Sequence, residues 1–143
     1  MTSSETSNYG AFASRFTLGS ILLAHGLLKV FVFTIPGTVG FFESLGLPAV
    51  VAYLTIFGEV VGGAALMLGL YSRLAALLSL PLMIGATWAH SANGWLFSNA
   101  GGGWEFPALL IALAVTVALQ GNGAFAIRTF PVVDKFIPAA LKA

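Results

Sequence analysis

The sequence has no cysteine and very few charged residues. The absence of cysteine from all 143 residues excludes disulfides, thiolate nucleophiles, cysteine-ligated zinc and iron–sulfur clusters within this chain. Charged residues make up 8%, whereas about 25% is usual in a soluble domain. Six Lys/Arg and five Asp/Glu residues are too few to cover a small water-soluble domain. With a net charge of +1, the chain also lacks the concentrated basic face that nucleic-acid binding requires.

Long apolar segments make up most of the chain. Hydrophobic residues account for 58% of it, against roughly 45–50% in an average soluble domain. A membrane-spanning helix needs about 20 mostly apolar residues, and four segments approach this requirement: 15–33, 49–70, 74–92 and 106–119. The sequence therefore predicts an all-α integral membrane protein, with a four-helix up-down bundle as its one domain over residues 15–121.

The distribution of lysine and arginine predicts how this bundle is oriented. With four spans, the two termini and the turn between the second and third spans share one side of the membrane. That side carries Arg15, Arg73, Arg128, Lys135 and Lys142. The other side carries at most Lys29. Because cytoplasmic loops hold the excess of cations, we expect both termini in the cytoplasm, with Arg15, Arg73 and Arg128 as topology anchors.

The segments outside the spans differ in character. Residues 1–14 form a polar N-terminal arm without Lys or Arg, so no secretory signal peptide is expected. Residues 122–143 mix cations with apolar side chains and predict an interfacial cytoplasmic tail. Residues 34–48 are too short and too broken to span. Three tryptophans near the loop of residues 93–104 suit either an interfacial belt or the mouth of a pocket: Trp88, Trp95 and Trp104.

Five ionisable residues fall in or next to the predicted spans, where each is costly unless it is paired or hydrated. They are His25, Lys29, Glu59, His90 and Glu105. At 1.5 Å per residue, the last four lie about 21–25 Å from the cytoplasmic ends of their helices. We therefore expect groups from all four helices to meet in the outer third of the membrane. His25 should lie one turn below Lys29 on the same helix face.

Purely structural roles suit some of these residues as well. Lys29 and Glu59 suit a buried ion pair that sets helix register, and His25 suits an interhelical hydrogen bond. Small residues in the second span predict close helix packing, and they are Gly58, Gly62, Gly63 and Gly69.

Three kinds of ligand can be compared for this polar cluster. Haem is disfavoured because His25 and His90 differ by about 10 Å in depth, whereas bis-histidine ligation needs them nearly level. A non-haem metal would need His90, Glu59 and Glu105 without any His–Glu pair at i, i+3 spacing, so no metal site is assigned. A quinone suits the cluster, because histidine and glutamate can bond its carbonyls and supply protons. A transported polar solute suits it too.

Several motifs follow one another in a fixed order. They are R-x9-H-G-x-x-K from Arg15, F-x-x-L-G-x-P from Phe42, G-E-x-x-G-G-x-x-L-x-L-G-L-Y-S-R from Gly58, then His90 and G-G-W-E at 102–105. Together they resemble the DoxX family of small four-helix bacterial inner-membrane proteins, over about residues 15–123. The chain departs from the family after Gly123, where the Asp of a Ser-Leu-Asp-like segment is missing.

The resemblance implies a multi-pass bacterial plasma-membrane protein linked to quinone-dependent oxidoreductase complexes. We therefore expect a redox-complex subunit that binds a quinone or similar amphipathic ligand near the outer face. The expected catalytic residues are His25, Glu59, His90 and Glu105, and the expected ligand-binding residues are Lys29, Trp88, Trp95 and Trp104. No electron carrier is evident in the chain, so a partner redox protein is expected, or a homo-oligomer. The alternatives are a non-enzymatic membrane anchor or assembly factor, and a small carrier or channel subunit.

Overall fold

The computed structural model describes residues 1–142, and its regular elements are helices, as the sequence predicts. Ala143, the last residue of the expected tail, lies outside the described residues. The helices are α1 (Ser3–Phe31), α2 (Ile35–Ser44), α3 (Ala49–Leu68), α4 (Ser72–His90), α5 (Glu105–Gln120) and α6 (Pro131–Asp134), with 3₁₀ turns at Ser91–Asn93 and Ala139–Leu141. Residues 1–142 contain no β-strand, and one isolated bridge joins Leu70 to Arg128.

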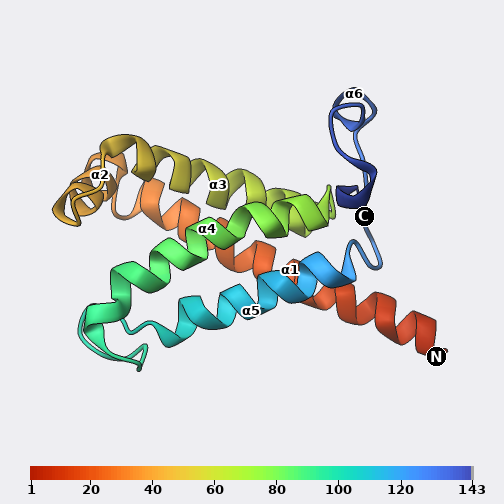
Figure 1. Ribbon diagram of the computed structural model, residues 1–143, viewed down its shortest axis with the longest axis horizontal. Coiled ribbons are helices and arrows are strands. Elements are labelled where there is room, and N and C mark those ends of the chain that lie inside the picture. Colours follow the sequence, from red (N-terminus) through yellow and green to blue (C-terminus); the bar gives the residue numbers. More distant parts are fainter. Residues whose placement is uncertain (143) are drawn as a thin grey trace.

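The four long helices run alternately up and down (Figure 1). Helix α1 packs mainly against α3, and α4 packs mainly against α5. Both termini lie at one end of the bundle, and α2 lies at the opposite end together with the loop that joins α4 to α5 (Figure 1). A core of small and aliphatic side chains holds the helices together and includes Leu18, Leu22, Leu66, Ala76, Leu110, Ala114 and Val117.

Three of these helices are long and apolar enough to cross a membrane, which agrees with the membrane character predicted from composition. They are α1, α3, and α4 continued to Asn93. Helix α5 has 16 residues, which is about 24 Å at 1.5 Å per residue, against about 30 Å of hydrocarbon in a bilayer. A fourth span therefore stays a prediction.

The N-terminal segment is helical and not a separate arm. Helix α1 begins at Ser3 because Thr2 and Glu5 form a capping box. The Thr2 hydroxyl accepts a hydrogen bond from the Glu5 N–H at 3.2 Å, and the Thr2 N–H donates to the Glu5 carboxylate at 2.7 Å. These contacts satisfy backbone donors that a helix start otherwise leaves free.

The segment after α1 also forms a helix, which the sequence analysis missed. Its glycines and proline suggested a broken loop, but Pro36 sits in the first turn of α2, where its missing N–H costs nothing. Thr34 caps this helix through Gly37 N–H at 3.3 Å, and the Thr38 hydroxyl donates to the carbonyl of Lys29 at 3.0 Å. Helix α2 is therefore fastened to the end of α1.

Arg15 is fully buried. A topology anchor, which is the role that we expected for it, would have an exposed side chain among the lipid headgroups. Its guanidinium donates to four backbone carbonyls, those of Leu66 at 2.6 Å, Met67 at 2.8 Å, Asn122 at 2.8 Å and Ala124 at 2.8 Å. The first two lie at the C-terminal end of α3, where carbonyls carry partial negative charge, and that of Leu66 also accepts from the Gly69 N–H at 3.2 Å. Arg15 thus joins α1 to the end of α3 and to the turn after α5.

The C-terminal tail folds back on the same end of the bundle. The phenol of Tyr71 donates to the Phe130 carbonyl at 3.0 Å and accepts from the Phe130 N–H at 2.9 Å. Arg73 reaches the carbonyl of Ala140 at 3.4 Å, while the Arg128 side chain is exposed. Exposed apolar side chains cover the tail, namely Phe125, Ile127, Phe130, Val132 and Phe136.

Close packing of α1 on α3 depends on Gly63 and its neighbours across the interface. A Cβ added to Gly63 would lie 2.6 Å from the backbone N of Leu23 and 2.8 Å from the carbonyl of Gly19. Gly62, which we expected to pack, has no atom within 4 Å of such a Cβ. Gly62 points away from α1 because adjacent helical residues differ by about 100° in direction.

The other two expected packing glycines have different neighbours. A Cβ on Gly58 would meet only the end of the Leu82 side chain on α4, at 2.8 Å. Gly69 ends α3 at φ +70°, and a Cβ there would meet Ala126 of the tail at 2.6 Å. The glycines of this segment therefore face three different parts of the structure and do not form one packing stripe.

Adjacent glycines provide a matched test of the α1–α3 contact. We expect Gly63→Ala to destabilise the protein by roughly 1–3 kcal/mol, because the backbone of α1 must move away. Gly62→Ala should be neutral or stabilise by up to about 1 kcal/mol, because alanine is the better helix former. Thermal unfolding in detergent measures both. Equal effects of the two substitutions would contradict this packing.

Candidate functional site

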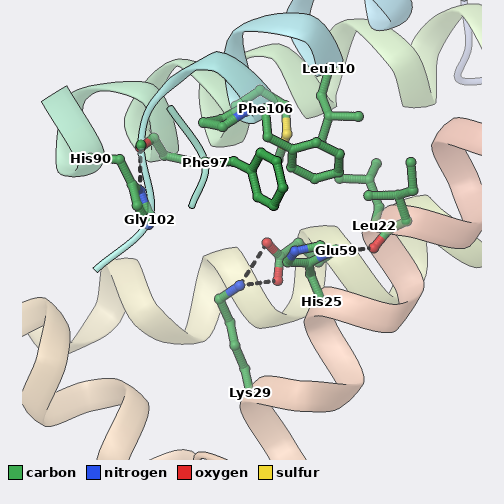
Figure 2. A pocket seen from close by; sticks show the side chains of 14 residues that line it. Leu22, His25, Lys29, Glu59, His90, Phe97, Gly102, Phe106 and Leu110 are labelled. Atoms are coloured by element: carbon green, nitrogen blue, oxygen red, sulfur yellow. Dashed lines mark hydrogen bonds and ion pairs between the residues drawn. The ribbon is translucent and has the colours of Figure 1, made fainter. Parts of the chain in front are cut away.

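One cavity of about 550 Å³ lies inside the bundle, which is within the usual size range of small-molecule sites. Its wall comes from α1, α3, α4, α5 and the loop between α4 and α5. Most of the lining side chains are apolar, and four are ionisable: His25, Lys29, Glu59 and His90 (Figure 2). The structure thus brings four of the five predicted ionisable residues to one cavity.

Lys29 and Glu59 form an ion pair between α1 and α3. The Nζ of Lys29 lies 2.9 Å from Oε1 and 2.8 Å from Oε2 of Glu59. The Glu59 side chain is 5% exposed and that of Lys29 is 18% exposed. The lysine ammonium therefore faces both oxygens of the carboxylate, and the pair presents its polar groups at the cavity.

His25 lies next to this ion pair, one turn along α1 from Lys29. Its Nδ1 is 2.8 Å from the carbonyl oxygen of Ile21, and the ring lies beside the Glu59 carboxylate (Figure 2). The ring stacks on Phe106 of α5, with centroids 6.1 Å apart and an interplanar angle of 28°. Both side chains are exposed, so the cavity wall is open between α1 and α5 at this point.

His90 lines a different part of the cavity, at the end of α4. Its Nδ1 is 2.8 Å from the carbonyl oxygen of Ala86. The Nε2 edge of the ring faces Gly102, where an added Cβ would lie 3.3 Å from Cδ2 and 3.7 Å from Nε2. In Figure 2, His90 lies beside Gly102, apart from the Lys29–Glu59 pair. The two histidines therefore do not form a common ligand pair.

Glu105 does not join the cavity cluster, contrary to our expectation. Its Oε1 accepts a hydrogen bond from the backbone N–H of Phe97 at 2.8 Å, and it is not among the residues that line the cavity. The hydrogen bond ties the first turn of α5 to the preceding loop. Glu105 thus shapes the loop that covers the cavity, and a metal held jointly by His90, Glu59 and Glu105 does not fit this arrangement.

The tryptophans also lie outside the cavity lining. Trp88 is exposed on α4, and Trp95 packs edge-to-face on Trp104 with centroids 4.5 Å apart. This contact closes the loop on itself, together with the Asn93 amide, which donates to the carbonyls of Gly101 and Gly102 at 3.0 and 2.9 Å.

Phe97 and Phe106 are cavity residues that the sequence analysis missed. Phe97 sits in an irregular loop, where no periodicity shows which way a side chain points. The position of Phe106 could have suggested its role, because it directly follows Glu105 at the start of a predicted helix. Within residues 1–142, no group of three His, Asp or Glu side chains is placed to hold a metal ion.

A double-mutant cycle tests whether Lys29 and Glu59 stabilise each other. We expect Lys29→Met and Glu59→Gln each to cost roughly 2–4 kcal/mol of unfolding free energy, because each leaves a poorly solvated group without its partner. The double variant should cost less than the sum, with a coupling of roughly 1–3 kcal/mol.

The exposed pair of Lys142 and Asp134 is a matched control, with Nζ and Oδ2 2.7 Å apart and side chains about one-third exposed. Lys142→Met should cost less than about 1 kcal/mol. Additive effects at Lys29 and Glu59 would show that the two side chains do not depend on each other.

Comparison with known proteins agrees with this architecture. The DoxX family model matches residues 10–92. A protein of Bacillus subtilis (strain 168) named "Putative oxidoreductase CatD" is 32% identical over 121 residues, which cover 85% of this chain and 86% of that protein. No solved structure gives a significant match. The family model covers more than half of the chain, including the Lys29–Glu59 pair, His25 and His90. The chain therefore belongs to the DoxX family.

Proposed function

We propose that this protein is a membrane subunit of a redox complex and binds a quinone or a similar amphipathic aromatic ligand in the cavity. The observation that carries the proposal is the grouping of His25, Lys29 and Glu59 on one wall of an otherwise apolar cavity. A ligand with a polar ring and an apolar tail matches a cavity that has one polar wall and is otherwise apolar. The oxidoreductase name of the Bacillus subtilis relative points to the same chemistry.

The cavity has surfaces for both parts of such a ligand. Leu22, Met83 and Leu110 line it with apolar surface, and Phe97 and Phe106 offer ring faces for stacking. The polar groups lie on the α1–α3 side. A ring would therefore be held between an aromatic cover and a hydrogen-bonding wall.

The opening between His25 and Phe106 suggests how the ligand enters. Both side chains are exposed and belong to different helices, α1 and α5. In a membrane, this side of the bundle faces acyl chains, where quinone-like molecules dissolve. We propose lateral entry at this point, without passage through water.

The cavity residues move protons and polarise groups. Glu59 and His25 would exchange protons with the ligand, and Lys29 would donate to a ligand oxygen while it neutralises Glu59. Glutamate, histidine and lysine side chains do not carry electrons. Electrons would therefore come from, or pass to, a partner redox protein.

We further propose that the protein crosses the bacterial inner membrane four times, with both termini in the cytoplasm. Support comes from the side that the termini share, where Arg73 begins α4 and Arg128, Lys135 and Lys142 follow α5. An excess of cations favours the cytoplasmic side, and Lys29 is the one lysine or arginine at the other end. Buried Arg15 does not contribute to this count.

Single cysteines test this orientation without background, because the natural chain has none. In right-side-out inner-membrane vesicles, a membrane-impermeant maleimide should label Ser98→Cys, in the loop after α4. It should label Ser4→Cys, near the start of α1, only after the membrane is permeabilised. The opposite pattern would show that the termini face outward.

Ligand binding is tested by calorimetric titration of the full chain in lipid nanodiscs with a short-tailed quinone and with its reduced form. We expect Glu59→Gln and His25→Ala to weaken binding of the more tightly bound form at least ten-fold, because each changes a polar group of the cavity wall. His90→Ala should weaken it less, since His90 lies apart from the Lys29–Glu59 pair. Glu43→Gln is the matched control, because Glu43 is an exposed carboxylate on α2. Unchanged binding in Glu59→Gln and His25→Ala would contradict the site.

A further inference from the structure

The hydrogen bonds of the two cavity histidines fix the position of their protons. In both residues Nδ1 lies 2.8 Å from a backbone carbonyl oxygen, of Ile21 for His25 and of Ala86 for His90. A carbonyl oxygen only accepts, so Nδ1 must carry the proton that it donates. In a neutral imidazole the other nitrogen, Nε2, then has a free lone pair and is an acceptor.

The polar wall is therefore richer in acceptors than in donors. Across residues 1–142, no hydrogen bond engages Nε2 of His25 or His90. The one cationic donor at the cavity is Lys29, whose Nζ lies 2.8–2.9 Å from both oxygens of Glu59, so at most one of its three N–H groups is left for a ligand. A buried acceptor without a donor costs free energy that a suitable ligand group can recover.

We propose that the cavity selects the hydroxyl-bearing form of its ligand, an aromatic diol such as a hydroquinone, over the carbonyl-bearing quinone form. This inference rests on the proposed function, because it concerns the same cavity and the same class of ligand. A hydroxyl hydrogen on the ring supplies the donor that Nε2 of His25 lacks. A quinone carbonyl brings only acceptors, and Lys29 has at most one N–H left to meet them.

The stacking of His25 on Phe106 supports this selection. The imidazole ring lies beside the Phe106 ring at a centroid distance of 6.1 Å. The hydrogen bond from Nδ1 to the Ile21 carbonyl sets which edge of the imidazole faces the backbone. Nε2 is thus held in place before a ligand arrives. A preorganised acceptor loses little freedom on binding, which favours discrimination between donor and acceptor ligands.

The test compares three probes that share one ring and one short alkyl tail. They are a hydroquinone, its quinone and its dimethyl ether, titrated by calorimetry into the full chain in nanodiscs, without oxygen and at a pH at which free imidazole is neutral. We expect the hydroquinone to bind at least ten-fold more tightly than the other two. The dimethyl ether keeps the shape of the hydroquinone but lacks its donors, so this comparison needs no variant.

A variant assigns the preference to His25. His25→Phe keeps an aromatic ring beside Phe106 and removes the acceptor, so the hydroquinone should lose most of its ten-fold advantage. Glu43→Gln should keep it, and the melting temperature of each variant checks that it is folded.

The outcomes separate this inference from the proposed function. If the quinone binds as tightly as the hydroquinone or more tightly, selection of the diol is wrong while the cavity remains a ligand site. Equal binding of all three probes would likewise contradict the inference, because the cavity would then recognise the shape of the ligand and not its hydroxyl groups. If no probe binds, the proposed function itself fails and the inference fails with it.

Discussion

The ion pair between Lys29 and Glu59 is the interaction on which the rest of the site depends. Both side chains lie among apolar helices, where an unpaired charge is costly, and each one neutralises the other at 2.8–2.9 Å. Lys29 belongs to α1 and Glu59 to α3. The pair therefore also sets which faces of the two helices are turned toward each other. Both residues also line the cavity. The contact that joins the two helices is therefore part of the cavity wall.

The α1–α3 interface is held at three levels by three different kinds of contact. Arg15 closes one end through two C-terminal carbonyls of α3, Gly63 lets the backbones approach in the middle, and the Lys29–Glu59 pair closes the other end. Water does not drive such helices together inside a bilayer, so hydrogen bonds, charge pairing and close packing must do so. This firmly joined pair of helices gives the cavity one rigid wall.

The rest of the cavity wall comes from more loosely arranged parts. At the start of α5, Phe106 stacks on His25 of α1, and both side chains are exposed. The covering loop is held by short polar contacts, among them the hydrogen bond from Phe97 to Glu105. A rigid polar wall opposite a lighter aromatic cover suits a ligand that arrives from the lipid and is recognised by its ring.

The sequence by itself determined the helical class, the apolar segments and the position of each ionisable residue along its helix, because that position depends only on the rise per residue. It placed Lys29 level with Glu59 in this way, and the structure joins them. Only the tertiary structure decided the direction of each side chain. Arg15 turns inward to carbonyls, Glu105 turns to the loop, Gly63 packs while Gly62 does not, and the carbonyls of Ile21 and Ala86 decide which histidine nitrogen stays free. These directions depend on how neighbouring helices are rotated and on which backbone groups they leave unpaired, and neither is a property of any single segment.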